Sequence, residues 1–547
     1  MNAIESLKQS FCQFLMSHFS LTPEQRRDVD FVINTDPQKA QFGDINCTVA
    51  LQLAKQLHKT PREIAQEIVN NFKHPFIKKI EIAGPGFLNF YLALDIFKVL
   101  AQELFDQKDT FFKAEQPTIH YNIEFVSANP TGPLHLGHGR GGIIGDTLTR
   151  VLKFLGYQVC AEHYINDAGA QMQKLGNSLK IRCQQELGHS IQLPEDAYHG
   201  QYLKDLAVQC VNKYGTTVLE QPDTFFIEYG YQHLLTLLKQ TLHEYGIEFD
   251  VWFSEKTLHA IKIKEALELL QKNGYLYNAD GAVWFRSTYF GDDKDRVLKK
   301  ADGEYTYAAA DAAYLLAKAE RGFNHIIIVL GQDHHSYPKR LEGIRKALDL
   351  DNVKLECIIY QLVSIKEGDQ YLKLSKRAGR IIGLSDVTQT VGKDIARFFY
   401  LNRKADAHLD FDMDLALSKT DENPVYYLQY AYVRTKSILE KAQKHPGLEG
   451  ITADDAQYLT DGEVLMLKKI IELKTLLATI ATNHQVHLIA YYLLEVAHIF
   501  HNYYHHNRVI EPETVGQSRG RLLLTALVKE QFERCLDLMG VSKPETM

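Results

Sequence analysis

The stretch SANPTGPLHLGHGRGG, residues 127–142, decides the fold of this chain of 547 residues. It follows a strand-like segment, TIHYNIEFVS, and precedes a helical pattern that ends at Gly156, a residue suited to a helix C-terminus. A second strand-like segment, YQVCAEHYIND, comes directly after. These three segments predict a β-α-β unit with a right-handed crossover. The apolar residues of the predicted helix recur at helical spacing: Ile143, Ile144, Leu148, Val151, Leu152 and Leu155.

Two histidines, His135 and His138, stand three residues apart where this helix is expected to begin. A glycine-rich turn at a helix N-terminus favours anions, because backbone N–H groups and the helix dipole both point at the ligand. Imidazoles can add hydrogen bonds to phosphate oxygens. The pattern therefore favours a mononucleotide site for ATP. No G-x-x-x-x-G-K-[ST] phosphate loop occurs anywhere in the chain.

Two other interpretations of this corner stay open at this point. Gly137, Gly139 and Gly142 fit the dinucleotide pattern G-x-G-x-x-G, with Glu162 about 20 residues further on. Against it, the strand ends near Ser127, and the residues between have no role in that geometry. The second alternative is a proline-rich connection with exposed histidines, which the β-α-β context argues against.

Composition describes an ordinary globular protein, with 45% apolar and 24% charged residues. The net charge of −7 gives no global sign of nucleic-acid binding, although a local basic face remains open. No two of the seven cysteines are spaced as C-x-x-C, so a reducing cytoplasm is expected. The N-terminus lacks the pattern of a secretory signal, and no run approaches about 18 apolar residues, so no membrane partner is predicted.

Three zones divide the chain. Residues 1–112 mix helical and strand-like segments around the turn AGPGF and predict a small α+β domain. Residues 113–395 predict a Rossmann-like α/β domain with a parallel sheet, to which the apolar run Ile326–Leu330 belongs, and with an inserted segment. Residues 396–547 predict a helical bundle.

These motifs carry a family resemblance. HLGH after a strand resembles the HIGH signature of class I aminoacyl-tRNA synthetases, and Lys373-Leu374-Ser375-Lys376-Arg377 resembles their KMSKS loop. The wider context resembles the arginyl-tRNA synthetase family over essentially the whole chain. The segments that carry it are GDINCTVALQLAK, AGPGFLNF, IEFVSANPTGPLHLGHGRG, HYINDAGAQ, FDVWFSE, DGAVWF, DDKDRVL, TYAAADAAY, NPVYYLQYAYVR, FHNYYHHNRVI and KPETM.

The resemblance implies a function and its partners. It implies ATP-dependent ligation of L-arginine to the 3′-terminal ribose of tRNA(Arg) through an arginyl-adenylate, with Mg²⁺ as cofactor. It also implies a monomer, and an activation step that needs tRNA present. By the same resemblance, zone 1–112 is a tRNA-contacting domain, zone 113–395 the catalytic domain and zone 396–547 the anticodon-binding domain.

Site residues are carried over in the same way. A guanidinium is planar and always charged, so it favours carboxylates placed for bidentate pairing. No protein-bound metal site is predicted, because the adjacent His334 and His335 point in different directions. The resemblance assigns catalysis to His135, His138, Lys373 and Lys376. It assigns ATP binding to Pro130, His135, Gly137, His138, Gly139, Ser375 and Lys376, and arginine binding to Glu124, Asn129, Tyr307, Asp311 and Gln332. It assigns tRNA binding to Phe87, Asn89, Arg434, Tyr503 and Arg508.

Other functions remain to be separated from this one. Glutamyl, glutaminyl and cysteinyl enzymes share both signatures, although the cysteinyl enzyme would be expected to have zinc ligands, whose spacing is absent. A small nucleotidyltransferase is excluded mainly by length. A catalytically silent RNA-binding paralogue would have no need of an intact ATP site. Pyrophosphate exchange with each of the twenty amino acids distinguishes these cases.

Overall fold

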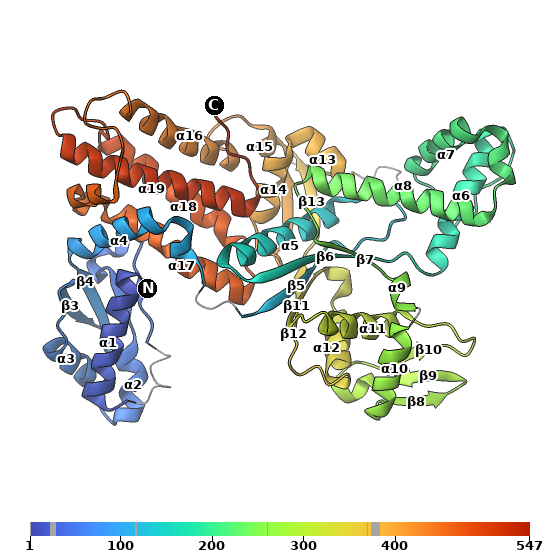
Figure 1. Cartoon of the computed structure of the whole chain (residues 1–547), viewed down its shortest axis with the longest axis horizontal. Coiled ribbons are helices and arrows are strands. Elements are labelled where there is room, and N and C mark those ends of the chain that lie inside the picture. The colour runs from blue at the N-terminus through green and yellow to red at the C-terminus, as the bar shows by residue number, and fades with distance from the viewer. Residues whose placement is uncertain (1, 22–28, 115–117, 260, 369, 373–382) are drawn as a thin grey trace.

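A parallel sheet of five strands lies at the centre of the molecule, in the order β12-β11-β5-β6-β7 (Figure 1). The computed structural model describes residues 2–21, 29–114, 118–259, 261–368, 370–372 and 383–547. The predicted α/β fold class is confirmed, with an α+β unit before this sheet and a helical unit after it. The strands of the sheet are β5 (His120–Glu124), β6 (Gln158–Ile165), β7 (Val251–Ser254), β11 (His325–Gly331) and β12 (Lys354–Tyr360).

Helix α5 (Leu136–Leu155) joins β5 to β6 and lies between the sheet and the C-terminal helices. Its glycines explain how close it lies to the strands. A Cβ at Gly145 would come within 2.2 Å of the Phe125 ring, and one at Gly141 within 2.6 Å of the Tyr360 ring. The glycines after the signature therefore serve helix-to-sheet packing, a role that the sequence pattern did not indicate.

Two insertions interrupt the sheet. Between β6 and β7 the chain forms a helical arm that projects away from the sheet and buries its own apolar cluster (Figure 1). Between β7 and β11 it forms a smaller unit around an antiparallel sheet. The arm consists of α6 (Ala170–Glu186), α7 (Gln201–Tyr214) and α8 (Asp223–Glu244). The smaller unit consists of α9 (Lys256–His259), α10 (Lys262–Lys272), β8 (Leu276–Ala279), β9 (Ala282–Phe285), β10 (Arg296–Lys299) and α11 (Tyr307–Glu320). Helix α12 (Tyr337–Ala347) follows β11.

The N-terminal unit packs helices on an antiparallel sheet of order β1-β2-β4-β3. Gly84 and Gly86 make the predicted turn between its last two strands, both at positive φ. A Cβ at Gly86 would come within 2.8 Å of Pro61, so glycine is needed there. The elements are α1 (Ala3–Phe19), β1 (Val32–Ile33), β2 (Ile45–Cys47), α2 (Val49–Leu57), α3 (Pro61–Asn71), β3 (Ile77–Ala83), β4 (Phe87–Leu92) and α4 (Leu94–Gln107).

After β12 the chain forms a small sheet and then the helical unit. One apolar core runs from the N-terminal unit through α5 into these helices. Ion pairs add to this contact, among them Lys468 with Asp44 at 3.1 Å and Arg534 with Asp109 at 2.8 Å. The elements are β13 (Val363–Glu367), β14 (Gln370–Leu372), α13 (Leu384–Val391), α14 (Lys393–Leu401), β15 (Leu409–Asp412), α15 (Met413–Leu417), α16 (Pro424–Ala442), α17 (Val464–Asn483), α18 (Leu488–His506) and α19 (Val515–Met539).

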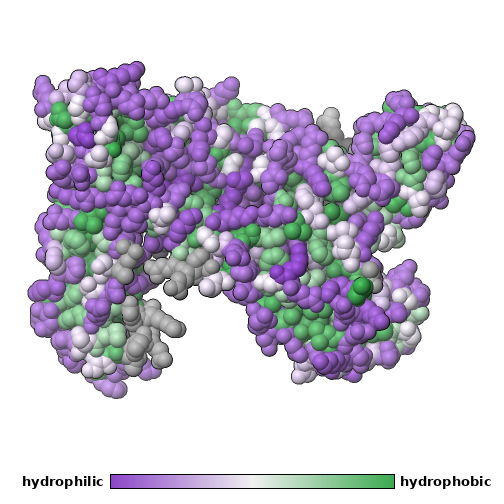
Figure 2. Space-filling view, in the orientation of Figure 1, coloured by the Kyte–Doolittle hydropathy of each residue, from purple (hydrophilic) through white to green (hydrophobic). Residues whose placement is uncertain are grey.

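Polar residues cover most of the face drawn in Figure 2, with apolar residues scattered among them. Among the helices of the described residues, none combines the length and the apolar character that crossing a membrane requires.

Candidate active site at the carboxyl edge of the sheet

The two histidines of the signature form a compact corner at the start of α5. His135 is the N-cap residue, and its Nδ1 accepts the N–H of Gly137 at 3.2 Å. Nδ1 of His138 accepts the N–H of His135 at 3.1 Å. The two rings stack with centroids 3.7 Å apart. The histidines thus satisfy N–H groups that a helix start leaves without intrahelical partners.

This capping fixes the tautomer of both imidazoles. A nitrogen that accepts a backbone N–H carries no proton, so in the neutral ring the proton sits on Nε2. Each ring therefore carries its donor proton on Nε2, near the positive end of the helix dipole. Such an arrangement can bind the oxygens of a phosphate chain.

The part of the chain that follows the second signature, from Gly383 onward, lies against this corner. Lys373, Ser375 and Lys376 lie outside the described residues. The chain is described again from Gly383, which pairs with His135 as an antiparallel bridge, and the N–H of Leu384 donates to the Leu134 carbonyl at 2.8 Å. The hydroxyl of Tyr245 donates to the Leu384 carbonyl at 2.9 Å. The residue that follows the lysine-bearing segment is therefore fixed beside His135.

The other residues predicted to bind ATP lie around the same helix start. Pro130 is buried in the loop before it. A Cβ at Gly137 would come within 3.1 Å of the His135 ring, and one at Gly139 within 2.4 Å of the Leu384 side chain. Gly139 thus allows α13 to approach α5. The dinucleotide interpretation loses its acidic residue, because Glu162 is fully buried and paired with Arg321 at 2.5 Å.

A strained turn ends the central strand β5. Val126 and Ser127 both have positive φ, at 68° and 39°, and the N–H of Ser127 donates to the Phe125 carbonyl at 2.9 Å. Positive φ is rare for a β-branched residue such as valine. Such strain is typical of ligand sites, where surrounding contacts hold it in place. Here the Ser127 hydroxyl donates to Glu124 at 3.0 Å and accepts the N–H of Tyr164 at 3.2 Å.

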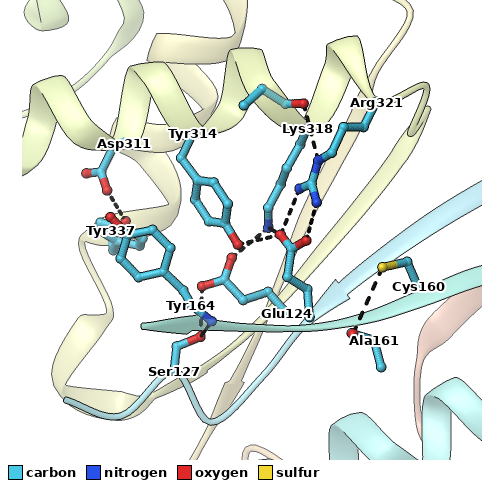
Figure 3. Close-up of polar contacts among 12 residues, drawn as sticks. Glu124, Ser127, Cys160, Ala161, Tyr164, Asp311, Tyr314, Lys318, Arg321 and Tyr337 are labelled. Carbon is cyan, nitrogen blue, oxygen red and sulfur yellow. Dashed lines mark hydrogen bonds and ion pairs between the residues drawn. The ribbon is translucent and has the colours of Figure 1, made fainter. Parts of the chain in front are cut away.

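Glu124 belongs to a buried network of charges that reaches it from α11 (Figure 3). Its second oxygen accepts a hydrogen bond from Nζ of Lys318 at 2.6 Å, and this ammonium is fully buried. Glu162 lies 3.7 Å from the same ammonium and also accepts from Arg321. Burial raises the pKa of Glu162, but Lys318 and Arg321 outweigh it, so the net pKa lies below its usual value. The Glu162 carboxylate is therefore charged at neutral pH.

Asp311, on α11, has a different environment. One carboxylate oxygen accepts the Tyr337 hydroxyl at 2.5 Å, while Oδ2 has no hydrogen-bond partner among the described residues. Nε of Arg340 lies 3.9 Å from Oδ2 and also has no such partner. Burial raises the pKa of Asp311 to about 6, against the hydrogen bond from Tyr337 and the charge of Arg340. Unlike Glu124, this carboxylate keeps one oxygen available for a cationic ligand.

The remaining residues predicted to bind arginine lie at exposed positions. Asn129 is exposed in the loop after β5, and Gln332 is exposed directly after β11. Tyr307 is 68% exposed at the first position of α11, four residues before Asp311 and so on the same face of the helix.

Sequence reasoning missed four residues of this edge: Lys318, Tyr337, Arg340 and Glu255. Glu255 is 5% exposed and directly follows β7, a position at which a carboxylate after a short apolar strand could have been noticed. Lys318 lies seven residues, or about two helical turns, beyond Asp311 on α11, but no pattern in the sequence marks it as buried.

The residues predicted to bind tRNA differ in exposure. Phe87 is 40% exposed at the start of β4, whereas Asn89 in the same strand is 5% exposed. Arg434 on α16 donates to Nδ1 of His501 at 3.0 Å, and its guanidinium lies 4.5 Å from the Tyr430 ring centroid. The side chain of Arg508 is 73% exposed.

Tyr503 faces the interior of the bundle, where its hydroxyl donates to Glu463 at 2.7 Å. Its neighbour Tyr504 is 36% exposed and lines two adjoining pockets of about 720 and 640 Å³. The first pocket is rich in cationic and imidazole side chains: Lys441, Lys444, His445, His505, His506 and Arg508.

Family models cover these units in chain order. The model described as "Arginyl tRNA synthetase N terminal domain" matches residues 4–92. The model described as "tRNA synthetases class I (R), catalytic domain" matches residues 99–406, and the "DALR anticodon binding domain" matches residues 428–547. Together with the parallel sheet and its histidine corner, the catalytic match defines a class I aminoacyl-tRNA synthetase.

Relatives over the full length agree with this class. The arginine–tRNA ligase of Shouchella clausii is 41% identical over 528 residues, which cover 95% of each chain. The Thermus thermophilus arginyl-tRNA synthetase superimposes with a TM-score of 0.74 at 21% identity, over 99% of this chain and 100% of that one. The Plasmodium falciparum arginyl-tRNA synthetase gives 0.77 at 19% identity over 100% of both. At these identities the two structures support the fold alone.

The chain belongs to the arginyl-tRNA synthetase family. It is an arginine–tRNA ligase that charges tRNA with arginine for protein biosynthesis, and its substrates are arginine, ATP and tRNA. The other class I amino-acid specificities and the silent paralogue are thereby set aside.

Proposed function

We propose that the chain ligates arginine to tRNA in two steps. The histidine corner, His135 and His138, would bind ATP, and the pocket around Glu124 and Asp311, the arginine pocket, would bind arginine. A carboxylate oxygen of arginine attacks the α-phosphorus of ATP, the bond to the bridging oxygen breaks, and pyrophosphate leaves. The terminal ribose hydroxyl of tRNA then attacks the carbonyl carbon of the adenylate, and AMP leaves. No side chain forms a covalent bond in either step. Catalysis comes from positioning and from stabilising charge on the phosphates.

The geometry at the start of α5 supports the first step: both histidines use Nδ1 to cap the helix, so the donor proton of each ring is on Nε2, at the helix N-terminus. We propose that these donors bind the phosphates from the helix side. Lys373, Ser375 and Lys376 would act from the segment that ends at Gly383, beside His135. Lys376 lies seven positions before Gly383, and a chain of that length spans at most about 25 Å, so the ammonium is within reach of the corner.

Mg²⁺ would enter on the phosphates and neutralise part of their charge. Asp386, three residues after Gly383, already accepts the N–H of Gly383 at 2.7 Å. We therefore assign no protein ligand to the ion.

For arginine, we propose a direct ionic contact to Asp311, whose Oδ2 has no hydrogen-bond partner among the described residues. Tyr307 would lie along the side chain of the substrate, since it precedes Asp311 by four residues on α11. Glu124 would contribute its negative charge while Lys318 and Ser127 hold it in place. Asn129 and Gln332, at the ends of neighbouring strands, would bind the amino and carboxylate groups.

For tRNA, we propose that unpaired anticodon bases stack in the pockets around Tyr504, with Arg434 and Arg508 beside them. Tyr503 would support this surface from inside the bundle. In the N-terminal unit, Phe87 would contact tRNA, and Asn89 would hold the strand that presents it. We expect arginine activation to require tRNA.

We also propose that the enzyme acts as a monomer in the cytoplasm. One polypeptide carries the ATP corner, the arginine pocket and the tRNA surface, which supports action as a monomer. Within the described part of the chain, which includes all seven cysteines, no disulfide joins any two of them, which supports a reducing compartment.

The lysine-bearing segment provides the test. Lys376→Ala should slow adenylate formation by ~10²–10³-fold while arginine binding changes little. Lys366→Ala, on β13 of the small sheet, is the matched control and should leave the rate unchanged. Equal losses in rate and in arginine affinity for Lys376→Ala would contradict the assignment.

A further inference from the structure

Three potential ligand atoms meet where the edge of the catalytic sheet contacts the C-terminal helices. His325 is the first residue of β11, Glu356 lies in the edge strand β12, and His484 ends α17. One ligand atom from each lies within 4.8 Å of the others. Nε2 of His325 is 2.5 Å from Oε2 of Glu356, and Nε2 of His484 is 3.9 Å from the same oxygen. The three come from parts of the chain that only the folded state brings together.

A hydrogen bond between His325 and Glu356 accounts for two of these residues but not for the third. His484 is 9% exposed, and its Nε2 has no hydrogen-bond partner among the described residues. A buried polar atom without a partner destabilises the fold by about 1–3 kcal/mol unless something satisfies it. The orphaned nitrogen faces the carboxylate that His325 already contacts.

We propose that His325, Glu356 and His484 bind one divalent cation of the late first transition row, with Zn²⁺ as the type, and that the ion links the catalytic sheet to the helical unit. Two imidazoles and a carboxylate are a ligand set that Zn²⁺ takes in proteins. This site is separate from the ATP and arginine sites and does not depend on their assignment.

The surroundings fit such an ion. Burial lowers the pKa of both His325 and His484, so both imidazoles are neutral at pH 7, the form that binds metal. The His325 ring stacks on Tyr121 with centroids 4.6 Å apart, which holds its orientation. A pocket of about 400 Å³, lined by Glu356 and His484, adjoins the cluster and gives room for a water as fourth ligand and for entry of the ion.

One competing charge must move. Nζ of Lys354 lies 2.8 Å from Oε2 of Glu356. The Lys354 side chain is 59% exposed, so its ammonium can turn into solvent when a divalent ion takes the carboxylate. Removing this ammonium should therefore strengthen metal binding.

The test uses the full chain, treated with a chelator and dialysed, then titrated with Zn²⁺ against a competing indicator. We expect one equivalent to bind. His484→Asn, which keeps a residue suited to the left-handed backbone, and Glu356→Gln should each weaken binding by more than the ~10–100-fold that loss of an outer-shell partner causes. Lys354→Met should tighten it. His487→Asn is the control, because His487 lines the same pocket without belonging to the cluster. The Zn²⁺ affinity of this variant should equal that of the wild type.

Two further measurements keep the result interpretable. Co²⁺ bound at the site should give the absorption of a tetrahedral nitrogen–oxygen centre, with no thiolate charge-transfer band. Zn²⁺ should raise the thermal midpoint of the wild type and of His487→Asn but not of His484→Asn, provided that far-UV circular dichroism finds all three folded. Equal Zn²⁺ affinity in the wild type and His484→Asn, or a cobalt spectrum with thiolate character, would overturn the proposal.

Discussion

The histidine corner and the proposed arginine pocket around Glu124 and Asp311 are built in opposite ways. The corner uses neighbouring residues, since His135 and His138 are positioned by backbone N–H groups two and three residues away. The pocket draws on β5, α11 and α12, and its charges are buried. The corner is therefore preorganised by one turn of chain, whereas the pocket depends on the packing of the whole catalytic unit. Substitutions should affect rate at the corner and substrate affinity in the pocket.

The largest effect is expected from Asp311→Asn. The amide can still accept from Tyr337, but it presents no charge to the guanidinium. Loss of one partner of a buried charge pair should reduce kcat/KM for arginine by ~10²–10³-fold, mainly through KM. Steady-state aminoacylation measures this. Glu320→Gln, at the exposed end of the same helix, should behave as wild type, and an unchanged KM in Asp311→Asn would remove Asp311 from the pocket.

At the corner, two variants of His138 separate capping from phosphate binding. In His138→Asn the amide oxygen can replace Nδ1 and preserve the cap, but no donor reaches the Nε2 position. His138→Gln should place a donor near that position and lose the cap. We expect the limiting rate of adenylate formation to fall by ~10²–10³-fold in His138→Asn and by less in His138→Gln. The thermal stability should fall more in His138→Gln, because that variant loses the cap. Rapid quench and thermal unfolding measure the two; the opposite order of rates would contradict the Nε2 assignment.

Acid should weaken arginine binding through Asp311. The pKa of Asp311 is raised to about 6, so below pH 6 the carboxylate is protonated and arginine binding must release that proton. KM for arginine should then rise about tenfold per pH unit. The stability contribution has the opposite sign: a raised carboxyl pKa means that the native state binds more protons than the unfolded one, so this term becomes more favourable as pH falls from 6 towards 4. A flat KM profile between pH 5 and 7 would contradict the burial of Asp311, and Asp311→Asn supplies the flat reference.

The smallest effect is expected from Tyr337→Phe. It removes one hydrogen bond that orients Asp311, which is worth about 0.5–1.5 kcal/mol, so KM for arginine should rise about 2- to 10-fold. Tyr289→Phe, at a ring that is 74% exposed, is the control. A rise as large as that of Asp311→Asn would mean that Tyr337 contacts the substrate itself.

The same contrast explains what the sequence could predict. The β-α-β unit and the corner were predictable, because capping, glycine spacing and helical periodicity are local. The partners of Glu124 and Asp311 were not, since Lys318 and Tyr337 lie about 190 and 25 residues away and no local pattern marks them as buried. The orientation of Tyr503 could have been predicted: Val496, Phe500 and Tyr503 follow one apolar face of α18, which leaves Tyr504 outside.

Single-turnover adenylate formation tests the division between corner and pocket most directly. The reaction would contain tRNA with a periodate-oxidised terminal ribose, so that no transfer follows, and arginine would be varied at saturating ATP. We predict that Asp311→Asn raises the arginine concentration that gives half the limiting rate and changes the limiting rate little, while His138→Asn lowers the limiting rate and leaves that concentration unchanged. If both variants altered both quantities alike, the corner and the pocket would not be separate sites.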